Sequence, residues 1–161
     1  MTARSLLTLL CILACSLPSH AIIARLAPDV SWLDASGVTR PTSSLRGQPI
    51  VLLIAPTPAN LSFRRQLAQL KPLTQKLLAQ KIIFIAAFTT EPGRVPSDIP
   101  FAIAADGPKV AFDYSSSNQF HIAIIGPDGN LDYITRKILP GQRILDIVGN
   151  SFARQRDLRR P

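Results

Sequence analysis

Two uninterrupted apolar segments, residues 50–55 and 82–88, constrain the fold of this chain more than any other feature. Neither segment alternates polar with apolar residues, which is the pattern of a strand covered on both faces in a parallel sheet. Between them, residues 62–78 place Leu or Phe at every third or fourth position, as in an amphipathic helix. A strand, a helix and a strand in this order form a right-handed crossover between parallel strands. The sequence therefore predicts an α/β fold.

The helix between these strands has a defined start and an internal interruption. Asn60 or Ser62 supplies the side-chain oxygen that caps its first free backbone N–H groups. Pro72 lacks a backbone donor, and its ring clashes with the preceding turn. We therefore expect a kink at Pro72, or a break into two helices.

Proline and glycine divide the rest of the chain into short elements. Residues 120–125 and 131–135 flank a turn at 126–130, which predicts an antiparallel hairpin. A last helix begins near Gly141. The other expected elements are an entrance hairpin within 27–39, a loop or helical turn at 42–47, a short strand at 101–105 and a helical turn at 108–112.

The first 21 residues are ordered like a secretory signal peptide. Arg4 supplies the positive start, residues 6–15 are mostly apolar, and small residues precede a cut after Ala21. The apolar stretch is shorter than the roughly 20 residues that span a membrane. We therefore expect residues 1–21 to be removed, which exports the protein to the periplasm or secretes it. Residues 22–153 then form one domain, followed by a basic tail at 154–161.

An alternative for the N-terminus is a lipoprotein signal. Ile12-Leu13-Ala14-Cys15 resembles the motif after which a cysteine is acylated, with Leu13 as its poorest match. A lipid on Cys15 would anchor the protein to a membrane, although a single chain binds weakly. Both cysteines of the sequence, Cys11 and Cys15, lie in this segment. With either signal, the domain that follows contains no thiol and no disulfide, so an ordinary hydrophobic core must stabilise it.

The order of the elements and several local strings resemble the exported thioredoxin-like and peroxiredoxin-like proteins. The strings are residues 27–30 with Asp34 and Gly37, residues 45–54 leading into the central strand, and residues 124–131 in the last hairpin. The resemblance covers nearly the whole chain after the signal. It implies a three-layer thioredoxin-like fold, with a central mixed sheet and helices on both faces.

The chain departs from that family where the family's chemistry lies. In the family, the central strand leads into a Cys-x-x-Cys motif at a helix N-terminus, where backbone dipoles lower the pKa of the nucleophilic thiol. The matching residues here are Ala59, Asn60, Leu61 and Ser62, and the family's cis-proline matches His121. Neither disulfide exchange nor thiol-based peroxide reduction proceeds without a thiolate.

We therefore expect a non-catalytic binding or scaffold module of the cell envelope, whose partner is an unidentified protein or envelope ligand and which needs no cofactor. An alternative is a non-thiol enzyme in which His121 works with a loop carboxylate. A lone strand histidine is more often structural, and no ligand cluster suggests a metal site. The predicted binding groove consists of Pro58, Ala59, Asn60, Leu61, Ser62 and His121.

Two further patterns have structural explanations. Ser62 has no recognisable base and orienting acid, so helix capping explains it better than nucleophilic catalysis. Asp128, Asn130 and Asp132 match the first ligand positions of a calcium loop. Tyr133 stands where such a loop needs glycine, so this segment is interpreted as a turn.

The chain is strongly basic, with a formal net charge of +8. The simplest interpretation of its C-terminal tail is a solvated, loosely held terminus. The alternative is an adaptor that docks on anionic lipid or an acidic envelope polymer. Such a patch would also attract nucleic acid, but export argues against that partner. The tail residues concerned are Arg154, Arg156, Arg159 and Arg160.

Overall fold

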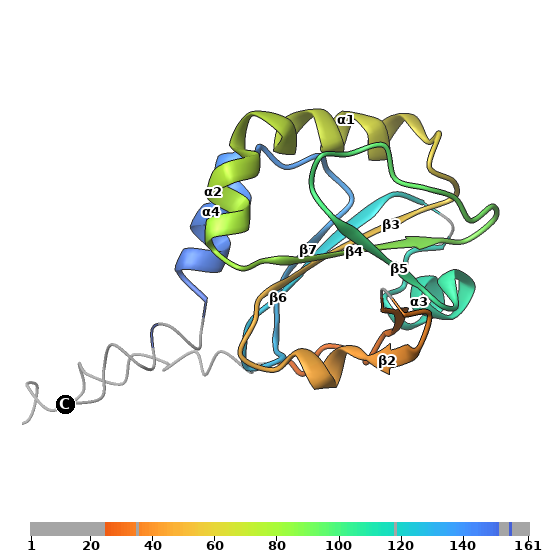
Figure 1. Cartoon of the computed structure of the whole chain (residues 1–161), viewed down its shortest axis with the longest axis horizontal. Helices are drawn as coiled ribbons and strands as arrows, with labels where there is room; N and C mark the ends of the chain where they lie inside the picture. The colour runs from red at the N-terminus through yellow and green to blue at the C-terminus, as the bar shows by residue number, and fades with distance from the viewer. Residues whose placement is uncertain (1–24, 35, 118, 152–154, 156–161) are drawn as a thin grey trace, which may run out of the picture.

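The computed structural model describes residues 25–34, 36–117, 119–151 and 155. Across these residues seven strands form one mixed sheet, in the order β2, β1, β5, β4, β3, β6 and β7 from edge to edge (Figure 1). This confirms the predicted α/β class with a central mixed sheet. The strands are β1 (Ser31–Leu33), β2 (Thr39–Pro41), β3 (Ile50–Ala55), β4 (Ile83–Phe88), β5 (Phe101–Ala104), β6 (His121–Ile125) and β7 (Leu131–Thr135).

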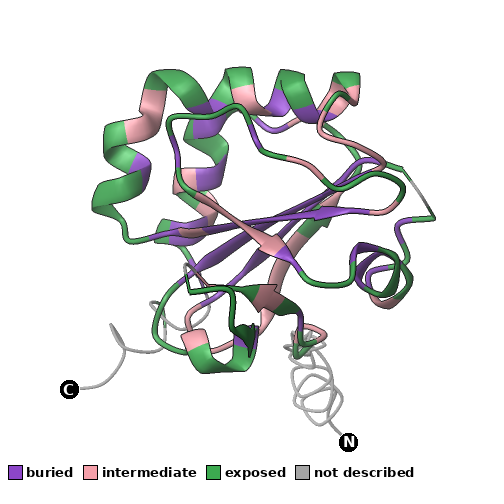
Figure 2. Ribbon diagram, turned by 45° about the vertical axis from the view of Figure 1, so that its right-hand side comes forward, coloured by how far each residue is buried: buried purple, intermediate pink, exposed green. Residues whose placement is uncertain are grey.

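The centre of the sheet is the parallel pair predicted from the two apolar segments. β3 and β4 pair in parallel, with Val51 beside Phe84. Every residue of β3 is buried, because both of its faces are covered (Figure 2). β6 pairs with the other side of β3 in the antiparallel sense, and β7 closes that edge as the second strand of a hairpin. The predicted parallel centre and antiparallel edge are both confirmed.

The helices form the two outer layers. They are η1 (Thr42–Leu45), α1 (Leu61–Leu70), η2 (Lys71–Leu73), α2 (Thr74–Ala79), α3 (Gly107–Asp113) and α4 (Gly141–Gly149). Alternate residues of β3 enter two separate cores. Leu53 packs on the face that α1, α2 and α4 cover, with Phe63 of α1. Leu52 packs on the opposite face, with Val110 of α3. Three layers, as predicted, are therefore present.

The amphipathic segment between β3 and β4 breaks at the predicted proline. α1 ends at Leu70, and Pro72 lies in the first turn of the 3-10 helix η2 before α2 begins. α4 starts against this break, since a Cβ atom on Gly141 would lie 2.6 Å from the carbonyl oxygen of Gln69. The close approach depends on the absence of a side chain at Gly141.

A buried glutamine ties α1 to the loop before α4. The Gln66 side chain is fully buried. Its Nε2 donates to the carbonyl oxygen of Leu139 at 2.9 Å, and its Oε1 accepts from the Leu139 N–H at 2.8 Å. Buried backbone N–H and C=O groups need hydrogen-bond partners. Leu139 lies outside any helix or strand, and the Gln66 side chain supplies the partners for both of its backbone groups.

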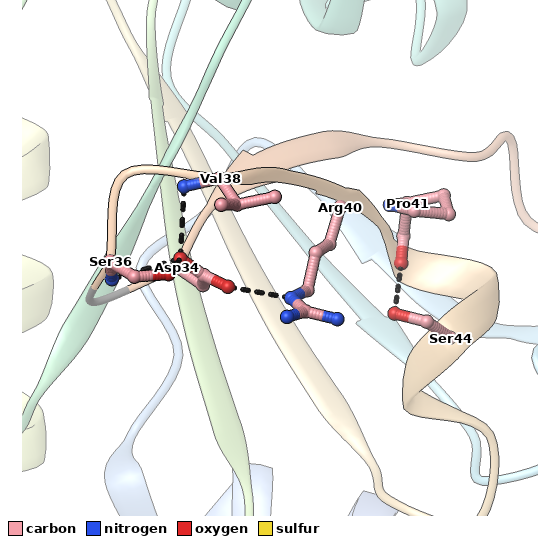
Figure 3. A network of polar contacts seen from close by, with 6 residues as sticks. All are labelled: Asp34, Ser36, Val38, Arg40, Pro41 and Ser44. Atoms are coloured by element: carbon pink, nitrogen blue, oxygen red, sulfur yellow. Dashed lines mark hydrogen bonds and ion pairs between the residues drawn. The ribbon is translucent and has the colours of Figure 1, made fainter.

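The entrance hairpin is organised by one aspartate (Figure 3). Asp34 Oδ1 accepts hydrogen bonds from the Ser36 hydroxyl, the Ser36 N–H and the Val38 N–H. Its other oxygen accepts from Arg40 Nε at 2.6 Å. The hydrogen bond from the Ser36 hydroxyl, followed by that from Arg40, holds the pKa of Asp34 well below its usual range. Gly37, with φ of 79°, completes the turn between β1 and β2.

Candidate functional site

Of the predicted binding residues, Pro58, Ala59 and Asn60 lie on the turn that joins β3 to α1, and Leu61 and Ser62 are the first residues of α1. The Thr57 carbonyl oxygen accepts a hydrogen bond from the Asn60 N–H at 3.1 Å. The Asn60 side-chain oxygen in turn accepts from the N–H groups of Ser62 and Phe63, both at 3.1 Å. Asn60 is therefore the N-cap of α1, and Ser62 is one of the two donors that it satisfies.

The loop after β4 supports this turn from the side. The Pro56 carbonyl oxygen accepts hydrogen bonds from the N–H groups of Thr90 at 3.0 Å and Glu91 at 3.2 Å. Further along the loop, a Cβ atom on Gly93 would lie 2.8 Å from Cγ of Pro58. The ring of Pro58 is thus half-buried against this loop, and its contact requires glycine at position 93.

His121 opens β6, where it pairs with Ile54 next to the end of β3. Its side chain is only 4% exposed. Arg136 Nε donates to His121 Nε2 at 3.1 Å, and His121 Nδ1 lies 3.3 Å from the Gln119 carbonyl oxygen. Because a guanidinium donates only, Nε2 must be the acceptor. Both ring nitrogens of His121 are therefore engaged with neighbouring groups.

The structure brings these residues to one end of the sheet but separates them by face. Phe120 and Ile122 belong to the core that α1 covers, whereas Ala123 belongs to the core on the α3 side. Side chains alternate along a strand, so His121 faces α3. The turn at residues 58–62 leads into α1 on the opposite face. A binding groove that uses both His121 and Ser62 would have to extend around the end of β3.

Residues 59–62 at the N-terminus of α1 carry no ionisable side chain. The first turn of α1 contains no acidic residue. Ala59 is exposed, and Leu61 is exposed to 59%. The positive end of the helix dipole would favour a thiolate here, as it does in the family that the sequence resembles. The side chains at 59–62 instead offer apolar contacts, one amide and one hydroxyl.

A cavity that the sequence did not predict lies between α3 and the loop after β4. It has a volume of about 610 Å³, and Phe112 on its rim is 85% exposed. The Thr89 N–H donates to the carbonyl oxygen of Ala55 at 3.0 Å, which places this cavity next to the end of β3. One feature of the sequence could have indicated this cavity. Phe112 directly follows Val110 and Ala111 in the predicted helical turn, so it cannot face the core together with them. The lining residues are Thr89, Thr90, Pro108, Ala111, Phe112, Ser115 and Ser117.

The segment that resembles a calcium loop is a hairpin turn, as interpreted. Asp128 Oδ1 accepts from the Asn130 N–H at 3.1 Å, and its Oδ2 accepts from Asn130 Nδ2 at 2.8 Å. In the part of the chain that the structure describes, no three His, Cys, Asp or Glu side chains are grouped to hold a metal ion. Within that same part, no helix has the length and apolar character needed to cross a bilayer.

Several predicted features lie outside the described residues. These are the signal peptide with Cys11 and Cys15, the membrane anchor on Cys15, and the tail arginines Arg154, Arg156, Arg159 and Arg160. The six groove residues, from Pro58 to Ser62 with His121, are placed by the structure, and their role in binding stays a prediction.

Comparison with solved structures identifies the fold. No protein-family model matches the sequence, and no curated protein is significantly similar to it. A thiol:disulfide interchange protein from Bacteroides sp. is 12% identical, with a TM-score of 0.63 over 80% of this chain and 91% of that one. A secreted disulfide oxidoreductase from Mycobacterium tuberculosis is 17% identical, with a TM-score of 0.57 over 79% and 98% of the two chains. The reduced 2-Cys peroxiredoxin of Plasmodium vivax is 12% identical, with a TM-score of 0.62 over 85% and 98%. These likenesses establish the thioredoxin-like fold.

Proposed function

We propose that this protein is a non-catalytic binding or scaffold module of the cell envelope, exported by its N-terminal signal and built on a thioredoxin-like fold without redox cysteines. One observation carries the proposal. The turn between β3 and α1, which matches the family's cysteine motif, holds Ala59 and Ser62 in place of thiols and is closed by the Asn60 cap. The sequence contains no cysteine after Cys15. Thiol chemistry therefore has no nucleophile in this domain.

The surface around this turn is suited to binding. Leu61 and Phe112 are both strongly exposed large apolar side chains, and each lies near the carboxyl ends of β3 and β4. Ligands of open α/β sheets bind at such ends. The neighbouring cavity of about 610 Å³ lies within the usual size range of small-ligand sites. We infer that the partner contacts the turn and extends toward Phe112.

The state of His121 supports binding rather than acid–base catalysis. Arg136 occupies one ring nitrogen and the Gln119 carbonyl oxygen lies beside the other. A general base needs a free lone pair that can reach its substrate. The alternative of a non-thiol enzyme that uses His121 would require Arg136 to move away first.

Site-specific photo-crosslinking in the cell envelope tests the proposal. A photoreactive phenylalanine analogue is introduced at Phe112, at Leu61 and, as a control, at Leu26. Leu26 has nearly the same exposure as Leu61, 61% against 59%, but it bridges to Asn130 in the turn between β6 and β7, at the other end of the sheet. We expect Phe112 and Leu61 to capture the same species and Leu26 to capture none of it.

The dose response separates a binding site from chance contact. Crosslinking at Phe112 and Leu61 should saturate, and unlabelled protein should compete it away. Equal capture from Leu26, or capture that rises without saturation at all three positions, would contradict a binding surface at the β3–α1 turn.

A further inference from the structure

The outer side of α1 and α2 carries exposed cations with no acid among them. The sequence contains no Asp or Glu between Asp34 and Glu91. We use the name cationic stripe for Arg64, Arg65, Lys71 and Lys76, all of which are exposed. The other side of these helices holds Phe63, Leu70 and Leu77 in the core, so the stripe faces away from the sheet.

No described residue forms an ion pair with the stripe. The two ion pairs among the described residues join Arg40 to Asp34 and Lys109 to Asp113, both away from α1 and α2. Successive cations after Arg65 are spaced five or six residues apart, which corresponds to about 8–9 Å of helix rise. This spacing is close to the Debye length of about 8 Å at physiological ionic strength, so their fields overlap.

We propose that the cationic stripe docks the protein on an anionic phospholipid bilayer. The uncharged residues exposed along it include Ala68, Gln69, Pro72, Gln75 and Ala79, and one large apolar side chain, Leu78. A protein interface has a desolvated centre rich in aromatic side chains and poor in lysine. In residues 61–80 the sequence has one aromatic residue, Phe63, and its side chain is buried. Basic side chains on an exposed helix are instead the pattern that anionic lipid headgroups attract. Leu61 of the proposed binding surface lies one helical turn before Arg64 and Arg65, so the stripe begins next to that surface.

One carboxylate provides a test of the sign of the interaction. Asp98 lies across a groove of about 400 Å³ from Arg64 and Lys71. It is exposed and forms no ion pair with another described residue. If the stripe binds anionic headgroups, Asp98 repels them, and Asp98→Asn should tighten binding.

Vesicle cosedimentation with matched triple variants tests the proposal. The probes are vesicles of phosphatidylcholine alone or mixed with phosphatidylglycerol, at low and at high salt. The stripe variant carries Arg64→Gln, Arg65→Gln and Lys76→Gln. The control variant removes the same number and types of charge elsewhere, through Arg25→Gln, Lys137→Gln and Arg143→Gln, all at exposed positions. Thermal unfolding of each variant checks that its fold is retained.

We expect the wild-type chain to bind the anionic vesicles only, and less strongly at high salt. The stripe variant should bind about tenfold more weakly or worse, and the control variant within about twofold of wild type. Equal losses in both variants would reduce the effect to net charge and overturn the proposal. The proposal would also be overturned if the wild-type protein did not bind anionic vesicles. That result is expected if the stripe binds an acidic protein instead.

A tail deletion distinguishes the stripe from the arginine tail. Removal of residues 154–161 should leave the difference between the stripe and control variants intact. If the deletion alone abolishes vesicle binding, the tail is the docking element and the proposal for the stripe is wrong.

Discussion

Asp29 connects the entrance of the domain to η1 through its carboxylate. It accepts hydrogen bonds from the Thr42 hydroxyl at 2.6 Å, and from the N–H and hydroxyl of Ser43. Burial raises the pKa of Asp29, but these hydrogen bonds outweigh it and hold the pKa below its ordinary value of 3.8. The folded state therefore favours the ionised carboxylate.

This shift predicts a dependence of stability on pH. Because the pKa is lowered on folding, the contribution of Asp29 is fully present above pH 3.8 and is lost as pH falls through the folded-state pKa. Asp29→Asn should cost about 1 kcal/mol at neutral pH and flatten the fall of the melting temperature in acid. Melting curves between about pH 6 and pH 2 measure both effects.

The matched control is Asp98→Asn, which removes an exposed carboxylate outside this hydrogen-bond network. In the Asp98→Asn protein, the melting temperature should fall with acid as steeply as it does in the wild-type protein. An Asp29→Asn protein whose melting temperature falls with acid as steeply as wild type would contradict the account of Asp29.

Residue patterns predicted the elements better than they predicted individual contacts. The cap at Asn60 followed from local chemistry, and the structure selects it over Ser62. The hydrogen bond from Arg136 to His121 did not follow, because the two residues lie fifteen positions apart in the sequence and only the β6–β7 hairpin brings them together. The clamp of Gln66 on Leu139 spans 73 positions and carries no local signal.

At the scale of elements, α3 sits so close to β4 that only glycine fits at its start. A Cβ atom on Gly107 would overlap the carbonyl oxygen of Phe88. A backbone atom cannot move aside as a flexible side chain can. Gly107→Ala should therefore destabilise the protein by about 2 kcal/mol or more, or displace α3 from the sheet. Chemical unfolding with near-UV circular dichroism measures both outcomes.

Gly149 at the end of α4 is the control for that prediction. A Cβ atom there would meet no heavy atom within 4 Å. Gly149→Ala should be neutral or stabilise by up to about 1 kcal/mol, since alanine loses less backbone entropy in a helix. If both substitutions lower the free energy of unfolding by the same amount, the tight packing of α3 on β4 is not a determinant of stability.

The strand and helix order was predictable because the patterns that specify it are local. The two apolar segments became β3 and β4, and Pro72 broke the helix between them. The face of the sheet on which His121 lies was harder to predict, because it depends on the register of β6 against β3. The cavity beside Phe112 was missed, because its walls come from the loop after β4 and from α3.

At the scale of the whole molecule, the thioredoxin-like fold positions the two surfaces for which we propose a role. One is the apolar end of the sheet at Leu61 and Phe112, and the other is the cationic stripe on α1 and α2. The same fold occurs in a thiol:disulfide interchange protein and a disulfide oxidoreductase that are 12% and 17% identical to this chain. The difference in chemistry that we propose comes from two positions at the start of α1, Ala59 and Ser62, rather than from the architecture.

Insulin reduction with dithiothreitol as the electron source tests this central claim most directly. Wild-type protein should not accelerate the reaction above the uncatalysed rate, whereas the variant with Ala59→Cys and Ser62→Cys should accelerate it, because the helix dipole then acts on a thiol. Acceleration by purified wild-type protein, at a rate that a contaminant cannot explain, would contradict the account.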